Sequence, residues 1–166
     1  MKVCITGASS SICENLIDHL RNRHDLTLVD VQYGPHFPQA VPRLIGSHVD
    51  RTFLRQVFQG QDAVIHTAIA HEDQNTSDEQ RWRVNVEGTL IVVQEAIAAG
   101  VKKLIYTSSL SVFDGYDLSV KEPGCENAEP KQCSFYGFTK YLGENIVRFH
   151  ADKYRLKSVV LRGSCR

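Results

Sequence analysis

The chain has no net charge and no long apolar run. Its 19 lysine and arginine residues balance 19 aspartate and glutamate residues, so no field of one sign favours nucleic acid or a membrane surface as a partner. No apolar run approaches the roughly 20 residues of a membrane span. Met1 leads directly into an apolar strand pattern, without a signal peptide. We therefore expect a cytoplasmic protein that binds neither nucleic acid nor a membrane.

Cysteine is present, but without the spacing of a disulfide framework or a zinc site. The five cysteines are odd in number and far apart: Cys4, Cys13, Cys125, Cys133 and Cys165. We expect buried thiols at the first two and loop thiols at the others. Four further residues of types that bind metals lie at and after the end of an expected strand: His66, His71, Glu72 and Asp73. A strand-end histidine before a polar loop is the commoner reading of that pattern, so no metal is expected.

Length and composition indicate one compact domain. A chain of 166 residues with 42% hydrophobic content can bury a core. Neither repeats, low-complexity tracts nor linkers interrupt it. Segments 31–40 and 114–133 carry Pro, Gly and Gln and predict loops. We expect a single domain over residues 1–166.

Short apolar runs alternate with helical patterns along the whole chain. Strands are expected at 2–6, 26–30, 43–46, 63–66, 103–107 and 158–161. Helices are expected at 12–20 after the turn that ends at Ser11, 52–58 after an Asp50 cap, 77–99 with Gly100 as its stop, and 135–154. This alternation predicts an α/β fold with a doubly wound parallel sheet, the Rossmann fold. Ligands of such sheets bind at the carboxyl ends of the strands, where Gly7, Asp30 and Ser109 fall.

The first expected strand runs into a turn of small residues and then into a helix. Ser11 and Glu14 have the spacing of a capping box at the helix start. Backbone N–H groups and the helix dipole converge at such a terminus, as a pyrophosphate requires. Asp30 ends the next strand about 20 residues beyond Gly7, where a carboxylate binds adenosine ribose hydroxyls and repels a ribose phosphate. The pattern predicts NAD in preference to NADP.

Tyr136 and Lys140 lie four residues apart on the expected helix 135–154. They share one face, so the ammonium can stabilise the phenolate. Lowering the pKa of a tyrosine from about 10 to about 7 needs roughly 4 kcal/mol of preferential phenolate stabilisation. The lysine and a nicotinamide cation together are expected to supply it. The pair therefore predicts a tyrosine that exchanges protons with a substrate.

Several short motifs together carry a family resemblance. They are Thr6-Gly7-Ala8, Asp30, Asp50, 62–68, 85–89, 106–109, 136–140 with Glu144, and Leu161-Arg162. In these motifs and their order the chain resembles the extended short-chain dehydrogenases/reductases across essentially its whole length. That family includes NAD-dependent nucleotide-sugar epimerases and dehydratases and 3β-hydroxysteroid dehydrogenases.

The resemblance implies catalytic roles for the matched residues. Tyr136 is the expected acid/base, and Lys140 lowers its pKa and holds the nicotinamide ribose. Ser109 is expected to orient the substrate oxygen, with Ser108 as the alternative. Asn85 matches the helix position that anchors a water in the proton relay. The implied chemistry is hydride transfer between a carbinol carbon and nicotinamide, with a proton moved by the tyrosine.

The resemblance also implies a set of NAD contacts. Asp50 matches the acid that faces the adenine, together with the following backbone N–H. The full set is Gly7, Ser10, Ser11, Ile12, Asp30, Asp50, Ala68, Tyr136 and Lys140. The segment 114–133 lies between Ser109 and Tyr136, so it is expected to border the substrate entrance.

Two features depart from the family pattern. The family turn reads Thr-Gly-x-x-Gly-x-x-Gly, and here Ser10 and Cys13 stand at the second and third glycine positions. A Cβ at these positions predicts weaker NAD binding through crowding of the pyrophosphate and the helix, unless the Ser10 hydroxyl binds phosphate. The chain also stops at Arg166, just past the last strand, where family members continue with the substrate-binding part. We expect an N-terminal fragment that is itself inactive.

The expected function is that of an NAD-dependent oxidoreductase, epimerase or dehydratase. Its substrate is expected to be a secondary alcohol or ketone, with a nucleotide sugar as first choice and a hydroxysteroid as alternative. The enzyme-free alternative is a dinucleotide sensor or scaffold of the same fold. The complete set of Ser109, Tyr136 and Lys140 argues against it. Whether a full-length form of the protein is a homodimer stays open.

Overall fold

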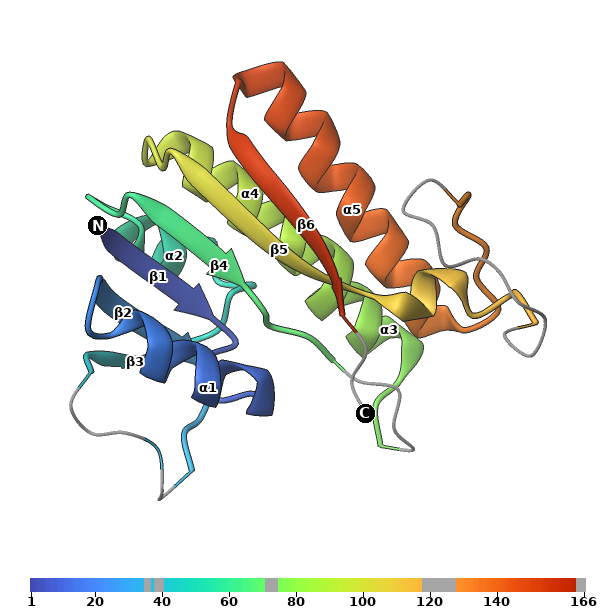
Figure 1. The fold of residues 1–166 in the computed structure, drawn as a ribbon, viewed down its shortest axis with the longest axis horizontal. Coiled ribbons are helices and arrows are strands. Elements are labelled where there is room, and N and C mark those ends of the chain that lie inside the picture. The colour runs from blue at the N-terminus through green and yellow to red at the C-terminus, as the bar shows by residue number, and fades with distance from the viewer. Residues whose placement is uncertain (35–36, 38–40, 71–74, 118–127, 164–166) are drawn as a thin grey trace.

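The computed structural model describes residues 1–34, 37, 41–70, 75–117 and 128–163. Its sheet has six strands in the order β3-β2-β1-β4-β5-β6, and every pair is parallel. The strands are β1 (Lys2–Thr6), β2 (Asp25–Asp30), β3 (Arg43–Ile45), β4 (Ala63–His66), β5 (Lys103–Ser109) and β6 (Lys157–Gly163). The doubly wound parallel sheet is confirmed, because the chain winds outward from β1 in both directions (Figure 1).

The helical elements lie on both faces of the sheet. They are α1 (Ser11–Leu20), α2 (Arg51–Val57), α3 (Asp78–Arg81), η1 (Trp82–Glu87), α4 (Gly88–Ala98), η2 (Leu110–Phe113) and α5 (Phe135–Tyr154). One core joins α2, α4 and α5 to strand residues such as Cys4, Val64 and Leu104. The other core joins α1 to the alternate residues, including Ile5 and Ile65. Successive strand residues point to opposite faces, which is why both faces are apolar.

The start of α1 differs from the expectation. Ser10, rather than Ser11, is the N-cap residue, and its side chain makes no capping hydrogen bond. The expected box of Ser11 with Glu14 is therefore wrong, because Ser11 is already helical. The Asp50 cap is confirmed, since its carboxylate accepts a hydrogen bond from the Phe53 N–H at 3.0 Å.

The expected helix 77–99 is one helical segment with an irregular middle. It runs through α3 and α4, but η1 between them is π-helical. Its capping box uses Ser77 and Gln80. Gly100 ends the segment with a φ of 74°, as its stop position predicted.

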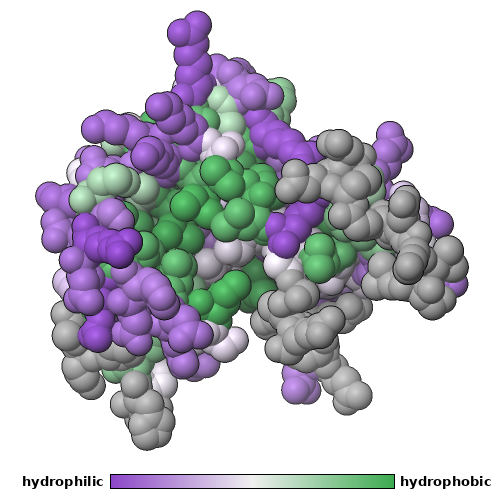
Figure 2. Space-filling view, in the orientation of Figure 1, coloured by the Kyte–Doolittle hydropathy of each residue, from purple (hydrophilic) through white to green (hydrophobic). Residues whose placement is uncertain are grey.

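One face of β4, β5 and β6 is open in the described part of the chain. In Figure 1 the helices α4 and α5 lie behind these strands, and α1 lies in front of the opposite half of the sheet. Hydrophobic residues gather on the open face (Figure 2). A cavity of about 500 Å³ is lined there by Val3, Ile65, Ile105 and Val159 among others. Val159 and Leu161 are each 51% exposed, so the edge strand β6 presents apolar surface to solvent.

Candidate active site

A cavity of about 350 Å³ lies at the carboxyl ends of the strands. Its lining comes from the turn before α1, the segment after β4, the ends of β5 and β6, and the start of α5: Ser10, Ser11, Ile12, Thr67, Ile69, Thr107, Ser108, Tyr136, Lys140, Leu161, Arg162 and Gly163. Parallel sheets bind ligands at this edge. The structure thus brings Tyr136 and Lys140 together with three of the residues expected at the turn.

Gly7 lets the turn after β1 approach the segment after β4. Its φ is 80°, and a Cβ built on it would lie 2.3 Å from the backbone nitrogen of Ala68. Its N–H donates to the Val29 carbonyl at 2.9 Å, which ties the turn to β2. Both the conformation and the close approach require glycine. Gly7 and Ala68 are therefore neighbours at the strand ends, as the expected cofactor site needs.

Ser10 and Cys13 are joined by hydrogen bonds inside the turn. The Ser10 hydroxyl lies 2.9 Å from the Gly7 carbonyl oxygen, to which it donates, and 3.3 Å from the Cys13 sulfur. Cys13 is fully buried and lies 3.2 Å from the Thr67 hydroxyl, which in turn donates to the Thr6 and Gly7 carbonyls. The turn thus accommodates both side chains through contacts of its own.

Asp30 is held against the turn by Ser9. Its Oδ2 accepts hydrogen bonds from the Ser9 N–H at 2.8 Å and the Ser9 hydroxyl at 2.7 Å. Its Oδ1 accepts from the Val31 N–H at 2.7 Å. These donors fix a carboxylate at the end of β2, beside the helix N-terminus.

Lys140 is buried although it carries a charge. The residue is 2% exposed, and its ammonium lies 4.4 Å from the centroid of the Tyr106 ring. Burial raises the pKa of Tyr106 well above its usual range, so this ring is a neutral face for the cation. The start of α5 is fixed by Ser134, whose hydroxyl accepts from the Gly137 N–H at 2.9 Å. Tyr136 therefore stands on the first turn of an anchored helix, one turn before Lys140.

The two candidate serines have different partners. The Ser108 hydroxyl donates to Glu144 Oε1 at 2.6 Å. The Ser109 hydroxyl oxygen accepts from the Ser111 N–H at 3.1 Å, and its proton goes to the Ser111 hydroxyl at 3.1 Å. A carboxylate holds a hydroxyl proton more strongly than a neutral hydroxyl does. Ser109 is therefore the more available donor, although Ser108 lies in the cavity lining.

Asn85 and Asp50 both have partners within the protein. The Asn85 Oδ1 accepts from the Ala70 N–H at 2.7 Å, and its Nδ2 donates to the Ala70 carbonyl and the Thr139 hydroxyl, each at 3.1 Å. Asn85 thus joins the segment after β4 to α5. The Asp50 carboxylate caps α2, so its expected contact with adenine stays a prediction.

Sequence reasoning missed several lining residues. Thr67, Ile69, Thr107 and Arg162 all follow or end a strand. The signal was present, since the carboxyl ends of parallel strands meet at one edge. The expectation of buried thiols at Cys4 and Cys13 and of a loop thiol at Cys133 is confirmed. Cys125 and Cys165 lie outside the described residues, as do His71, Glu72 and Asp73.

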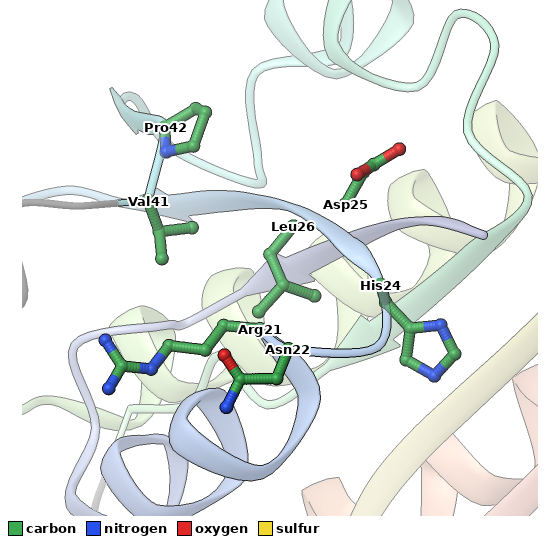
Figure 3. Close-up of a pocket in the computed structure, with 7 residues that line it drawn as sticks. All are labelled: Arg21, Asn22, His24, Asp25, Leu26, Val41 and Pro42. Carbon is green, nitrogen blue, oxygen red and sulfur yellow. The ribbon is translucent and has the colours of Figure 1, made fainter.

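Another cavity, of about 390 Å³, opens at the opposite, amino-terminal edge of the sheet (Figure 3). Arg21 and His24 in its lining point away from each other, and none of the expected site residues lies there. Among the described residues, no three His, Cys, Asp or Glu side chains gather as metal ligands do. The helices in the described ranges are too short or too polar to cross a bilayer.

Comparison with known sequences identifies the family of the chain. A sequence model of the NAD-dependent epimerase/dehydratase family matches residues 3–164. The chain belongs to this family. The resemblance to extended short-chain dehydrogenases/reductases is thereby confirmed.

Three similar proteins differ in the substrate or bound ligand that their descriptions name. The human sterol-4-alpha-carboxylate 3-dehydrogenase is 33% identical over 86% of this chain and 38% of its own length. A short-chain dehydrogenase/reductase superfamily protein of Agrobacterium tumefaciens, solved with bound NAD, is 27% identical with a TM-score of 0.84 over 98% of this chain and 48% of its own. UDP-glucose 4-epimerase of Thermotoga maritima, solved with UDP-glucose, is 26% identical with a TM-score of 0.85 over 98% and 55%. The chain spans about half the length of these proteins.

Proposed function

We propose that the protein is an NAD-dependent oxidoreductase or epimerase that acts on a secondary alcohol or ketone through Tyr136. The observation that carries the proposal is the shared cavity at the carboxyl edge, which Tyr136 and Lys140 line together with Ser10, Ser11 and Ile12 of the turn. A dinucleotide bound along this edge would be held by the N-terminus of α1 at its diphosphate and by Tyr136 and Lys140 at its nicotinamide end.

The residues at the edge suit NAD. Gly7 adopts the conformation that the close turn needs, and the first N–H groups of α1 have no partner within the helix. The Asp30 carboxylate is oriented by Ser9 and suits the ribose hydroxyls. Lys140 supplies a buried positive charge beside the expected nicotinamide ribose. The A. tumefaciens protein with bound NAD supports the same cofactor here.

When bound, NAD accepts or returns a hydride at nicotinamide C4. In the oxidative direction, Tyr136 takes the proton of the substrate hydroxyl while the carbinol C–H bond breaks. Lys140 favours the phenolate by its charge, and Ser109 donates a hydrogen bond to the substrate oxygen as a carbonyl forms. In the reductive direction Tyr136 returns the proton. The cluster of Asn85, Ala70 and Thr139 holds the segment after β4 against α5, so the acid/base stays in register with the cofactor site.

A nucleotide sugar is the proposed substrate class. The similarity to the T. maritima epimerase solved with UDP-glucose supports it. A hydroxysterol is the second candidate, because the human sterol dehydrogenase is 33% identical and because Ile12, Ile69 and Leu161 make part of the lining apolar.

The test combines binding with turnover. NAD and NADP are titrated calorimetrically into the chain, and UDP-sugars and 3-hydroxysterols are supplied as substrates to the chain and to a full-length form. Product chromatography detects epimerisation, and NADH absorbance detects net oxidation. NAD binding with conversion of one substrate class supports the proposal. NAD binding without conversion in any form would favour a dinucleotide sensor instead.

A further inference from the structure

The helical segment that carries Asn85 is widened into a π-helical turn. Residues Trp82–Glu87 form η1, between the α-helices α3 and α4. Such turns are rare and are frequently found at functional sites. Asn85 and Thr89, at and just after this turn, are each 1% exposed, so the polar groups here need partners within the protein.

His48 supplies one of these partners. Its Nε2 lies 2.9 Å from the Val84 carbonyl oxygen, and a carbonyl only accepts, so Nε2 carries the proton. His48 is 7% exposed and follows the far strand β3 in the chain. Gly88 makes room for it, because a Cβ at that position would lie 2.4 Å from the same Nε2 atom.

His66 supports the turn through Thr89. The Thr89 hydroxyl donates to the Asn85 carbonyl at 2.7 Å, so its oxygen is left to accept from His66 Nε2, 3.2 Å away. The other ring nitrogen, Nδ1, then accepts from the Thr6 hydroxyl at 2.7 Å. Because His66 donates through Nε2 and accepts through Nδ1, its ring is the neutral tautomer with the proton on Nε2. This chain of bonds begins at Thr6, directly before Gly7, and ends at Asn85.

We propose that His48 and His66 are positioning residues in the form of neutral Nε2–H tautomers. His48 holds the Val84 carbonyl of the π-helical turn directly, and His66 holds the Asn85 carbonyl through Thr89, so together they orient Asn85 toward Ala70 and α5. The Asn85 side chain bonds both backbone groups of Ala70 and the Thr139 hydroxyl. Thr139 in turn donates to the Tyr136 carbonyl at 2.8 Å. The catalytic consequence rests on the proposed function, whereas the positioning of Asn85 does not.

The surroundings keep both imidazoles neutral. Burial lowers the pKa of His66 well below its usual range, and the nearby His48 and Lys140 lower it further. Burial also lowers the pKa of His48, against opposing effects of the Val84 carbonyl and Asp30 and with a further lowering by Lys140. The two rings lie 5.2 Å apart, and the neutral Tyr106 ring lies 5.8 Å from His66. Two imidazolium ions at this spacing would repel each other.

The structural test uses the 166-residue chain and needs no turnover. Histidine ¹⁵N NMR reads the tautomers, and hydrogen exchange reads the Ala70 N–H that Asn85 accepts. We expect neutral Nε2–H rings at 48 and 66 at about pH 7. His48→Leu should speed exchange at Ala70 roughly tenfold by freeing the turn, whereas His48→Gln, which retains an N–H donor, should stay within about twofold. His150→Leu, on the distant end of α5, is the matched control.

Thr89→Val tests the contribution of His66. It replaces by a methyl group the hydroxyl that lies between His66 and the Asn85 carbonyl, and it should speed Ala70 exchange to a degree similar to that of His48→Leu. In the shortest form that turns over, His48→Leu should lower kcat roughly tenfold with KM for NAD nearly unchanged, because a small displacement of catalytic groups is costly.

A charged ring at position 48 or 66 near pH 7, or unchanged Ala70 exchange in both His48→Leu and Thr89→Val, would overturn the inference. If Ala70 exchange responds but Tyr136→Phe leaves turnover intact, the positioning role stands and the proposed reaction fails.

Discussion

Arg162 and Glu144 form a two-pronged ion pair beneath the candidate active site. The Nε and Nη2 atoms of Arg162 donate to the two carboxylate oxygens of Glu144, each at 2.8 Å. Glu144 is completely buried and also accepts from Ser108 and Arg148. The carboxylate therefore fastens the edge strand β6 and the end of β5 to α5. This arrangement holds the strand end at Ser109 close to the helix that carries Tyr136.

Glu144→Gln should destabilise the fold in a pH-dependent way. Burial alone would raise the pKa of Glu144, but hydrogen bonds from Arg162 and Ser108 outweigh it and hold the pKa below its usual value. The carboxylate therefore stabilises the fold fully above about pH 4.3, and this contribution is lost as the pH falls through the lower folded-state pKa. At pH near 7 the variant should lose about 2–4 kcal/mol of unfolding free energy, because the partly buried Arg162 guanidinium loses its counter-charge.

Urea denaturation of both proteins at several pH values measures this effect. The difference between wild type and Glu144→Gln should shrink as the pH falls from about 5 to about 3. Glu14→Gln, at an exposed position on α1, is the control. A difference that stays constant with pH would show that the charge of Glu144 contributes nothing.

Asp30 should make the protein prefer NAD. Its carboxylate is fixed by Ser9 at the end of β2, where it would repel a ribose phosphate and bind ribose hydroxyls. Asp30→Asn should weaken NAD binding and narrow the gap between NAD and NADP by roughly tenfold, equal to about 1.4 kcal/mol of lost discrimination. Calorimetric titration with both dinucleotides measures this. Equal affinities for NAD and NADP in the wild type would contradict the role of Asp30.

The two non-glycine residues of the turn should respond differently to replacement by glycine. The Ser10 hydroxyl bonds within the turn, so Ser10→Gly should tighten NAD binding by giving the diphosphate more room. Cys13 is fully buried on α1, and Cys13→Gly should cost about 1–2 kcal/mol of unfolding free energy through lost helix propensity and packing. NAD titration and thermal unfolding separate the two effects. Weaker NAD binding by Ser10→Gly would instead identify the hydroxyl as a phosphate ligand.

The open apolar face should make the 166-residue chain self-associate. Val159 is 51% exposed on this face, and Val159→Thr replaces one methyl by a hydroxyl at nearly equal volume. Because about 0.8–1 kcal/mol accompanies each buried methylene-sized group, the variant should associate roughly fivefold more weakly in sedimentation equilibrium. Ile45→Thr, on the far strand β3 and 74% exposed, should change association little. A monomeric wild type at high concentration would refute this expectation.

Apolar runs and turn residues predicted the parallel sheet well, but they could not resolve local choices. At the start of α1, Ser10 and Ser11 have nearly equal capping preference, and they differ only in the folded backbone, where Ser10 is extended (φ −70°, ψ 149°) and Ser11 is the first helical residue. The assignment of the cap to Ser11 was wrong for that reason. The π-helical turn could not be predicted either. Its Val84 carbonyl bonds to His48, which is distant in the chain, and its Asn85 carbonyl bonds to the Thr89 hydroxyl.

The candidate site was predictable where it depends on the sheet. Tyr136, Lys140 and the turn meet because parallel strands bring their carboxyl ends to one edge. The partners of these residues were not predictable. Burial of Lys140 against the Tyr106 ring depends on α5 packing over β5, and such long-range contacts leave no local pattern in a single sequence. The catalytic roles assigned to the site residues stay predictions.

The most direct test of the account is Tyr136→Phe, compared with wild type for both NAD affinity and turnover. The substitution removes one oxygen and keeps the ring on the first turn of α5. The shortest form of the protein that converts a nucleotide sugar or hydroxysterol is assayed for kcat, and calorimetry gives the affinity for NAD. Loss of the proton path predicts a fall in kcat of roughly 10²–10⁴-fold with NAD affinity changed less than about threefold. A kcat near that of the wild type would contradict the assignment of Tyr136 as the acid/base.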